Sequence, residues 1–252
     1  MANPVLNEKT FAPEHVAQWQ GAGVTPTRVM TLDGTIFRSL IMLALLLAGG
    51  AVGWAATSTG ADGELAFPAW MVLPLIAGLV LGLVVAFVPK FAPIGAPLYA
   101  VSYGLVVGAL SKAYEEWYSG IVLQAVAITA AVFGVMLLLY TSRAIRVTPR
   151  VRLTIIGATF GILVVYLISW IVSLFGVTVP FLSNGLFGLL FSVVVAGVAA
   201  FNLLLDFDVI ERGSNAGAPV YMSWYAAFGL TVTLVWLYLS ILRILAILNG
   251  NR

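Results

Sequence analysis

The chain contains no cysteine and a single histidine, His15, which lies in a polar N-terminal tail. Without cysteine, disulfides, thiolate metal sites and a thiol nucleophile are excluded. Because no histidine lies in an apolar segment, a Ser-His dyad or a histidine-based zinc cluster at membrane depth is excluded as well. We therefore expect that the protein is not an enzyme and that it holds no cofactor or resident metal.

Charged residues are also scarce, at 9% of the 252 residues, whereas 62% are hydrophobic and the mean hydropathy is +1.07. A soluble domain needs more polar side chains to cover its core, so this composition indicates an integral membrane protein. Long unbroken apolar runs favour spanning helices over a membrane β-barrel, whose strands alternate over about ten residues. The net charge of +2 is spread over loops, so no nucleic-acid partner is expected.

Seven apolar runs lie between polar breaks, and each can cross the roughly 30 Å hydrocarbon layer as a helix. The sequence thus predicts an all-α fold, a polytopic bundle of seven transmembrane helices. The third run is the shortest and is preceded by Pro93 and Pro97, so a six-helix count with a re-entrant segment stays open. The predicted helices cover residues 36–57, 69–88, 96–112, 119–140, 153–175, 182–205 and 220–247.

Residues 1–34 are mostly polar and are predicted to form an N-terminal tail, followed by a transmembrane domain over residues 35–252. Within the tail, residues 11–20 could form a short interfacial helix or remain disordered. A cleaved signal peptide is not expected, because the first apolar run follows the tail and is too long for a signal-peptide core.

Lysine and arginine favour one set of alternate loops, by nine to three. Because positive loops face the cytoplasm, the N-terminus is predicted to be cytoplasmic and, after seven helices, the C-terminus external. Residues 143–152 hold four arginines, which we interpret as a topology anchor that also attracts anionic lipid rather than as a specific partner site. The richer side carries Lys9, Arg28, Arg38, Lys90, Arg143, Arg146, Arg150, Arg152 and Arg212; the other carries Lys112, Arg243 and Arg252.

Three carboxylates and one arginine gather in residues 203–213, at the predicted end of the sixth helix. An ionisable side chain at membrane depth is costly, so its retention indicates an ion path, a proton sensor or a buried pair. Asn202 and Asp206 share one helix face, and Asp208 and Arg212 form a second such pair nearer to water. Since burial disfavours the charged form of a carboxyl, Asp206 could change charge near neutral pH. In the structural alternative, Asp206 caps or pairs with a neighbouring helix while Asp208 neutralises Arg212.

The predicted external face carries a second group of charges. Lys112 precedes Glu115 and Glu116 by three and four residues, which predicts a local salt-bridge cluster, with an external cation site as the alternative. Arg243 lies near the external end of the last helix, too far from Asp206 to be its counter-ion. Glu115 or Glu116 could pair with Arg243, or the arginine could snorkel to water.

Glycines four residues apart recur in the apolar runs, and such pairs let two helix backbones approach closely. We interpret them as packing contacts within the bundle rather than as evidence for a dimer. The pairs are Gly49 and Gly53, Gly78 and Gly82, Gly104 and Gly108, and Gly157 and Gly161.

The seventh helix carries small and polar residues at three-and-four spacing, in a stripe that includes Gly229, Thr233, Ser240 and Arg243. A stripe of this kind on an otherwise apolar helix indicates a face toward the bundle interior. The helix is therefore predicted to be central.

Four segments of the sequence resemble the transmembrane Bax inhibitor motif family, in particular its bacterial Bax inhibitor-1/YccA-like branch. The similarity covers most of the chain from about Met30 onward. The segments are residues 30–34, 120–133, 205–213 and 224–239. The resemblance implies a seven-helix bundle around a central C-terminal helix in the bacterial cytoplasmic (plasma) membrane, acting as a pH-sensitive calcium leak channel.

In the channel model that the resemblance implies, an aspartate near the cytoplasmic end of helix six faces a second aspartate on helix seven. Asp206 matches the first aspartate, whereas the second falls near Thr233, and residues 222–252 contain no acid. Two close carboxylates share a proton and make a pH latch, but an aspartate that faces a threonine makes an ordinary hydrogen bond.

Our first hypothesis is therefore a slow cation leak, with calcium as the permeant ion. Asp206 is its gate, Asp208 and Glu211 are its cytoplasmic mouth, and Asn202 adds an oxygen ligand. The alternative is a non-conducting regulator that binds a membrane protease or another membrane complex, which the missing second carboxylate favours. The lipid bilayer is the partner in both hypotheses, and only the second requires a protein partner.

Overall fold

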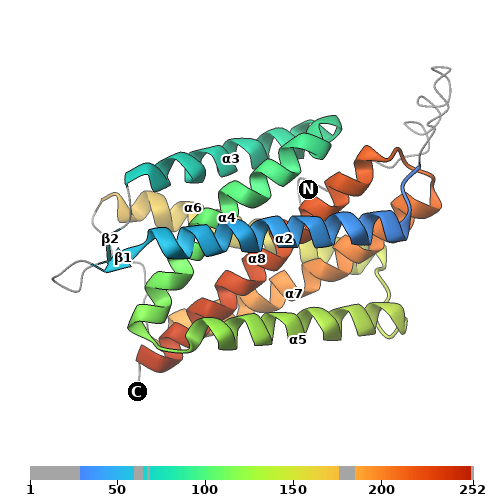
Figure 1. The fold of residues 1–252 in the computed structure, drawn as a ribbon. Helices are drawn as coiled ribbons and strands as arrows, with labels where there is room; N and C mark the ends of the chain where they lie inside the picture. The colour runs from blue at the N-terminus through green and yellow to red at the C-terminus, as the bar shows by residue number, and fades with distance from the viewer. Residues whose placement is uncertain (1–28, 60–64, 67–68, 176–184, 251–252) are drawn as a thin grey trace. The chain divides into compact units, whose positions relative to one another are not determined.

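The computed structural model describes residues 29–59, 65–66, 69–175 and 185–250. Six of its helices are long and apolar enough to cross a membrane, and α3 is a shorter apolar helix of 16 residues. The helices in the described residues are α2 (Leu32–Ala56), α3 (Val72–Phe87), α4 (Ala92–Trp117), α5 (Ile121–Thr141), α6 (Pro149–Ser173), α7 (Leu186–Asn215) and α8 (Tyr221–Gly250), as Figure 1 shows. The expected interfacial helix over residues 11–20 lies outside the described residues.

Short elements join α2, α3 and α4. Strands β1 (Ser58–Thr59) and β2 (Leu65–Ala66) pair antiparallel between α2 and α3, and the 3-10 helix η2 (Ala69–Met71) precedes α3. A second 3-10 helix, η3 (Pro89–Phe91), makes the turn into α4.

The helical membrane fold is confirmed, but the expectation that the third helix is the short one is wrong. The helix α4 has 26 residues, and α3 is the short helix. Pro93 lies in the first turn of α4, where a missing N–H costs little, and Pro97 can remove only the bond to the Pro93 carbonyl. Pro93 therefore marks the start of α4, and Pro97 lies inside the helix without ending it.

The helix α7 extends ten residues past its predicted end at residue 205, so the acidic segment 203–213 is helical throughout. The helix stops at a Schellman motif, in which the N–H of Ala218 donates to Gly213 and the N–H of Gly217 donates to Ser214. Gly217 has φ +64°, a left-handed conformation that costs glycine little.

The chain divides into two compact parts. Among the described residues, the α2–α4 part contains those up to Trp117 together with Asp208–Thr231, and the α5–α6 part contains those in the range Tyr118–Phe207 and the rest of α8 from Val232. The division cuts α7 after Phe207 and α8 after Thr231.

In the α2–α4 part, α2 crosses α4 at glycines. A Cβ at Gly49 would lie 2.5 Å from the Val101 carbonyl oxygen, and one at Gly53 would lie 2.8 Å from the Leu105 carbonyl carbon. From the other side, a Cβ at Gly108 would lie 2.7 Å from the Gly50 Cα. Two of the four predicted glycine pairs therefore pack backbone against backbone, within one chain as expected.

The third glycine pair packs against aromatic rings. Cβ positions at Gly78 and Gly82 lie 3.4 and 3.3 Å from the rings of Tyr103 and Tyr99 on α4. Tyr99 stacks on Tyr103 with 5.3 Å between ring centroids, and it meets Phe228 of α8 edge-on at 4.8 Å. The helix α3 is thus held on α4 by tyrosine faces.

One end of the α2–α4 part joins the start of α2 to the α7–α8 turn. The N–H of Met30 donates to the Ala218 carbonyl at 2.7 Å, and the Arg38 guanidinium lies over the Trp224 ring, 5.6 Å from its centroid. The Tyr225 hydroxyl donates to the Ala86 carbonyl at 3.4 Å and so satisfies an acceptor near the end of α3.

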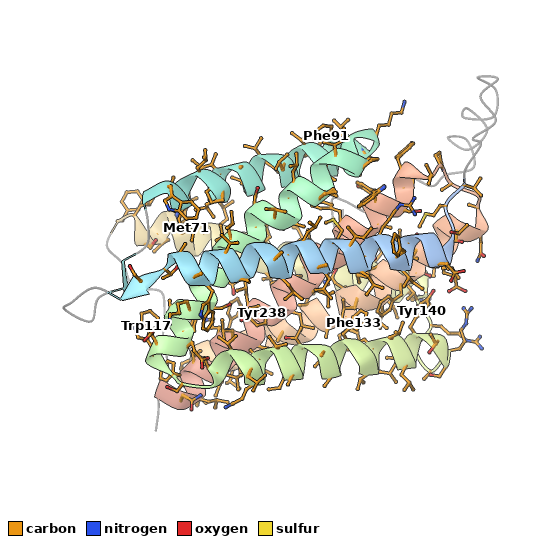
Figure 2. The ribbon with its side chains drawn as sticks, in the orientation of Figure 1. Met71, Phe91, Trp117, Phe133, Tyr140 and Tyr238 are labelled. Carbon is orange, nitrogen blue, oxygen red and sulfur yellow. The ribbon has the colours of Figure 1, made fainter. Side chains whose placement is uncertain are left out.

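In the α5–α6 part, α5 contacts α7 through aromatic rings. Phe207 of α7 lies 5.6 Å from Phe133 and 5.7 Å from Tyr140, centroid to centroid, and Figure 2 shows both partners on α5. Within the part of the chain that the structure describes, nothing lies within 4 Å of a Cβ at Gly157 or Gly161 of α6, so the prediction of close packing is wrong for that pair. Glycine spacing permits a close approach but does not supply the facing surface.

Burial separates the helices into two groups. In the most apolar stretches of α7 and α8, half of the residues are buried, compared with 11% in α5 and 17% in α6. High burial of α8 agrees with an interior helix, and its central position stays a prediction.

Candidate functional site

Asp206 is the most deeply placed carboxylate of the acidic segment, with 1% of its surface exposed. Its neighbours Leu203, Leu204 and Phe207 are buried too. A hydrogen bond between α6 and α7 shows how far Asp206 lies from the start of α6. Asn202 donates to the hydroxyl of Thr159, which lies ten residues, or about 15 Å, into α6. Because the two helices run antiparallel, Asp206 lies one turn closer to the start of α6, roughly 9 Å inside that end.

Asn202 connects this face of α7 to α6. Its amide nitrogen donates to the Thr159 hydroxyl at 2.8 Å and to the Val198 carbonyl at 2.9 Å. Both amide hydrogens are therefore used, which orients the side chain and leaves the carbonyl oxygen as its remaining polar group. Asn202 is 3% exposed, so the α6–α7 contact places a second buried polar group one turn from Asp206.

Asp208 and Arg212 form the ion pair expected from their spacing. The Arg212 Nε donates to Asp208 Oδ1 at 3.1 Å and Nη2 donates to Oδ2 at 2.5 Å. The side chain of Asp208 is 12% exposed and that of Arg212 is 47% exposed, so the arginine is the solvent-exposed partner of the pair. Glu211, next to this pair, is half-buried. Asp208 is more buried than expected.

The small and polar stripe on α8 is buried. Thr233 and Ser240 are 3% and 7% exposed, and Gly229 is buried as well. The Ser240 hydroxyl donates to the Trp236 carbonyl, and on α7 the Ser192 hydroxyl donates to the Gly188 carbonyl, both at 2.8 Å. A hydroxyl that donates within its own helix keeps its oxygen lone pairs for another donor or a cation.

Lys112 of α4 and Arg243 of α8, two charged residues of the predicted external side, each contact a nearby side chain. Lys112 forms an ion pair with Glu116, as its spacing predicts, and its ammonium lies over the Trp54 ring, 5.3 Å from the centroid. The Arg243 Nη1 donates to the Tyr166 hydroxyl of α6 at the long distance of 3.5 Å. A pair between Arg243 and Glu115 or Glu116 stays a prediction.

A family model described as Bax inhibitor 1 like matches residues 3–250 of the chain. The chain belongs to the Bax inhibitor 1 like family. No curated protein matches its sequence significantly. The family match confirms the resemblance stated from the four sequence segments, and it covers every described helix.

Sequence reasoning missed three residues that position the site in this Bax inhibitor 1 like protein. They are Thr159, which accepts from Asn202, Tyr166, which accepts from Arg243, and Phe207, which packs beside Asp206. Thr159 and Tyr166 are polar groups in an apolar helix and could have been singled out on that ground. Phe207 gives no such signal, because aromatic residues are common in membrane helices.

No three acidic or histidine side chains gather into a metal-binding group among the residues that the structure describes. The acids of α7 have different surroundings instead: Asp208 is bound to Arg212, and Asp206 lies deeper beside Asn202. Of the three acids on α7, Asp206 is therefore the most buried.

Proposed function

We propose that the protein is a pH-sensitive leak channel for cations, with calcium as the permeant ion and Asp206 as its gate. The observation that carries the proposal is a carboxyl 1% exposed and roughly 9 Å inside the end of the neighbouring helix α6. A buried ionisable group in a spanning helix is costly, so a functional role is the default interpretation.

Buried oxygen atoms in the α5–α6 part support a cation path. Hard cations such as Ca²⁺ require several oxygen ligands. The carbonyl oxygen of Asn202 and the hydroxyl oxygens of Ser192 and Ser240 keep acceptor lone pairs in an otherwise apolar interior. With Asp206 they supply carboxylate, amide and hydroxyl oxygens, which suit a passing hard cation.

The charged end of α7 suits the mouth of such a path. Asp208 and Glu211 follow Asp206 within the next five residues of one helix, and Arg212 offsets part of their charge. The excess of Lys and Arg in the loops on that side favours a cytoplasmic position for this mouth and for the N-terminus.

The test is calcium flux into proteoliposomes that contain the purified full chain, between about pH 6 and 8. We expect a pH-dependent flux that Asp206→Asn alters, because the amide keeps the size of the side chain and cannot ionise. Asp33→Asn, in the exposed first turn of α2, is the matched control and should leave the profile unchanged. Folded protein that conducts no more than empty liposomes at any pH would refute the channel.

The second candidate is a non-conducting regulator of a membrane protease or another membrane complex. Thr233 favours it, because this buried threonine stands where the channel model has a second aspartate. A single carboxyl lacks the shared proton that makes a steep pH latch. Absence of flux, together with a membrane protein that co-purifies with wild type and not with Asp206→Asn, would support the regulator.

A further inference from the structure

The loop between α5 and α6 is positively charged with no acid near it in the sequence. Four arginines lie within residues 143–152, and residues 117–205 contain no aspartate or glutamate. Arg143, Arg146 and Arg150 are exposed and Arg152 is half-exposed. For Arg146 and Arg150, no ion pair is formed with any residue that the structure describes. Residues 143–152 are called the arginine loop below.

Two of these arginines occupy positions that local structure disfavours. Arg143 ends α5 with φ +58°, a left-handed conformation that glycine adopts readily and that costs other residues energy. Arg150 lies in the first turn of α6, directly after Pro149, where the helix dipole repels a cation. A sequence selected only for its fold would have glycine at position 143 and an acid or a neutral residue at position 150.

The helix segments on either side of the arginine loop in the sequence carry exposed apolar side chains. Leu138, near the end of α5, is 66% exposed, and Leu153, one turn into α6, is 68% exposed. Exposed cationic side chains close in sequence to exposed leucines match a molecule with an anionic head and an apolar tail. A soluble phosphate would use only the arginines, and an acidic protein segment would leave the leucine surface uncovered.

We propose that the arginine loop is a binding surface for anionic phospholipid, whose phosphate headgroups contact Arg146 and Arg150 and whose acyl chains lie on Leu138 and Leu153. Guanidinium groups bind phosphate oxygens in a bidentate manner, which gives more than diffuse attraction to a charged surface. The surface lies wholly within the α5–α6 part, and the proposal is independent of ion conduction.

The experiment is native mass spectrometry of the delipidated full chain titrated with phosphatidylglycerol or with phosphatidylcholine of the same acyl chains. We expect wild type to prefer phosphatidylglycerol. Because a basic residue near an anionic surface contributes about fivefold to affinity, Arg146→Gln and Arg150→Gln should each weaken phosphatidylglycerol binding by about that factor. Lys90→Gln removes one exposed charge in η3 and should change the affinity little.

Equal binding of the two lipids by wild type would overturn the proposal, and so would an equal loss in Lys90→Gln, which indicates diffuse electrostatics. Glycerol phosphate that competes as strongly as the lipid would show an anion site without a lipid surface. Wild type alone gives a second measurement: added salt should weaken phosphatidylglycerol binding and spare phosphatidylcholine. Lack of salt dependence would refute the proposal even if the variants fail to fold.

Discussion

Replacing Gly53 by alanine tests whether the α2–α4 crossing depends on backbone contact. A Cβ there would lie 2.8 Å from the Leu105 carbonyl carbon, whereas real Cβ contacts are essentially never shorter than 3.0 Å. The obstacle is main chain, so no side-chain rotation relieves it. The two helices would have to separate by several tenths of an ångström or more along their shared face.

The magnitude follows from two opposed effects. Overpacking of a tight interface costs about 1–3 kcal/mol, and a backbone obstacle places Gly53→Ala near the upper end of that range. Alanine in place of a helical glycine recovers about 0.5–1 kcal/mol of helix propensity. We therefore expect a net loss of about 2 kcal/mol in the free energy of unfolding.

Gly50→Ala is the matched control on the same helix. Its nearest atom would be the Gly104 carbonyl oxygen at 3.7 Å, an ordinary van der Waals contact, so only the propensity gain of about 0.5–1 kcal/mol remains. The assay is equilibrium unfolding in mixed detergent micelles, followed by far-UV circular dichroism. If Gly53→Ala is as stable as Gly50→Ala, the close crossing of α2 and α4 is wrong.

Three further predictions concern charged and polar positions. Arg143→Gly should be about 1 kcal/mol more stable than Arg143→Ala in the same assay, because only the glycine relieves the left-handed φ; equal stabilities would contradict the strain. A double-mutant cycle on Asp208 and Arg212 should give a coupling of about 1 kcal/mol or less, since Arg212 is 47% exposed and solvent screens the pair; a larger value would show a desolvated pair. Thr233→Asp should steepen the pH dependence of calcium flux, because a second carboxyl near Asp206 would share its proton. A pH profile equal to that of wild type would show that residues 206 and 233 do not lie close together.

The helices of the fold were predictable because apolar runs of spanning length leave few alternatives in a bilayer. The errors have local causes. The third helix was expected to be short after Pro93 and Pro97, yet Pro93 lies in the first turn, where it costs little, and the helix continues through Pro97. The end of α7 was placed at residue 205 because charges begin there, yet the chain stays helical until Gly217 and Pro219 end it. Hydropathy locates the membrane, whereas backbone chemistry locates the helix ends.

The candidate site was predictable where helical spacing alone decides a contact. Asp208 and Arg212, or Lys112 and Glu116, are four residues apart on one helix and meet as predicted. Contacts between helices were not predictable in this way. Asn202 reaches Thr159, 43 residues away, and Gly157 lacks the close neighbour that Gly108 has, although both belong to the same sequence pattern.

The two parts of the molecule differ in how much movement their contacts tolerate. In the α2–α4 part, glycines bring main chain against main chain, so sliding α2 along α4 would force backbone atoms together. In the α5–α6 part, the inter-helix contacts around Asp206 include one side-chain hydrogen bond from Asn202 and the rings of Phe133 and Tyr140 on Phe207. Rings and side chains can change rotamer, whereas a backbone crossing cannot, so local opening requires less free energy here. Asp206 therefore lies in the part of the chain whose described inter-helix contacts are the more adjustable, which is the arrangement that the proposed gate requires.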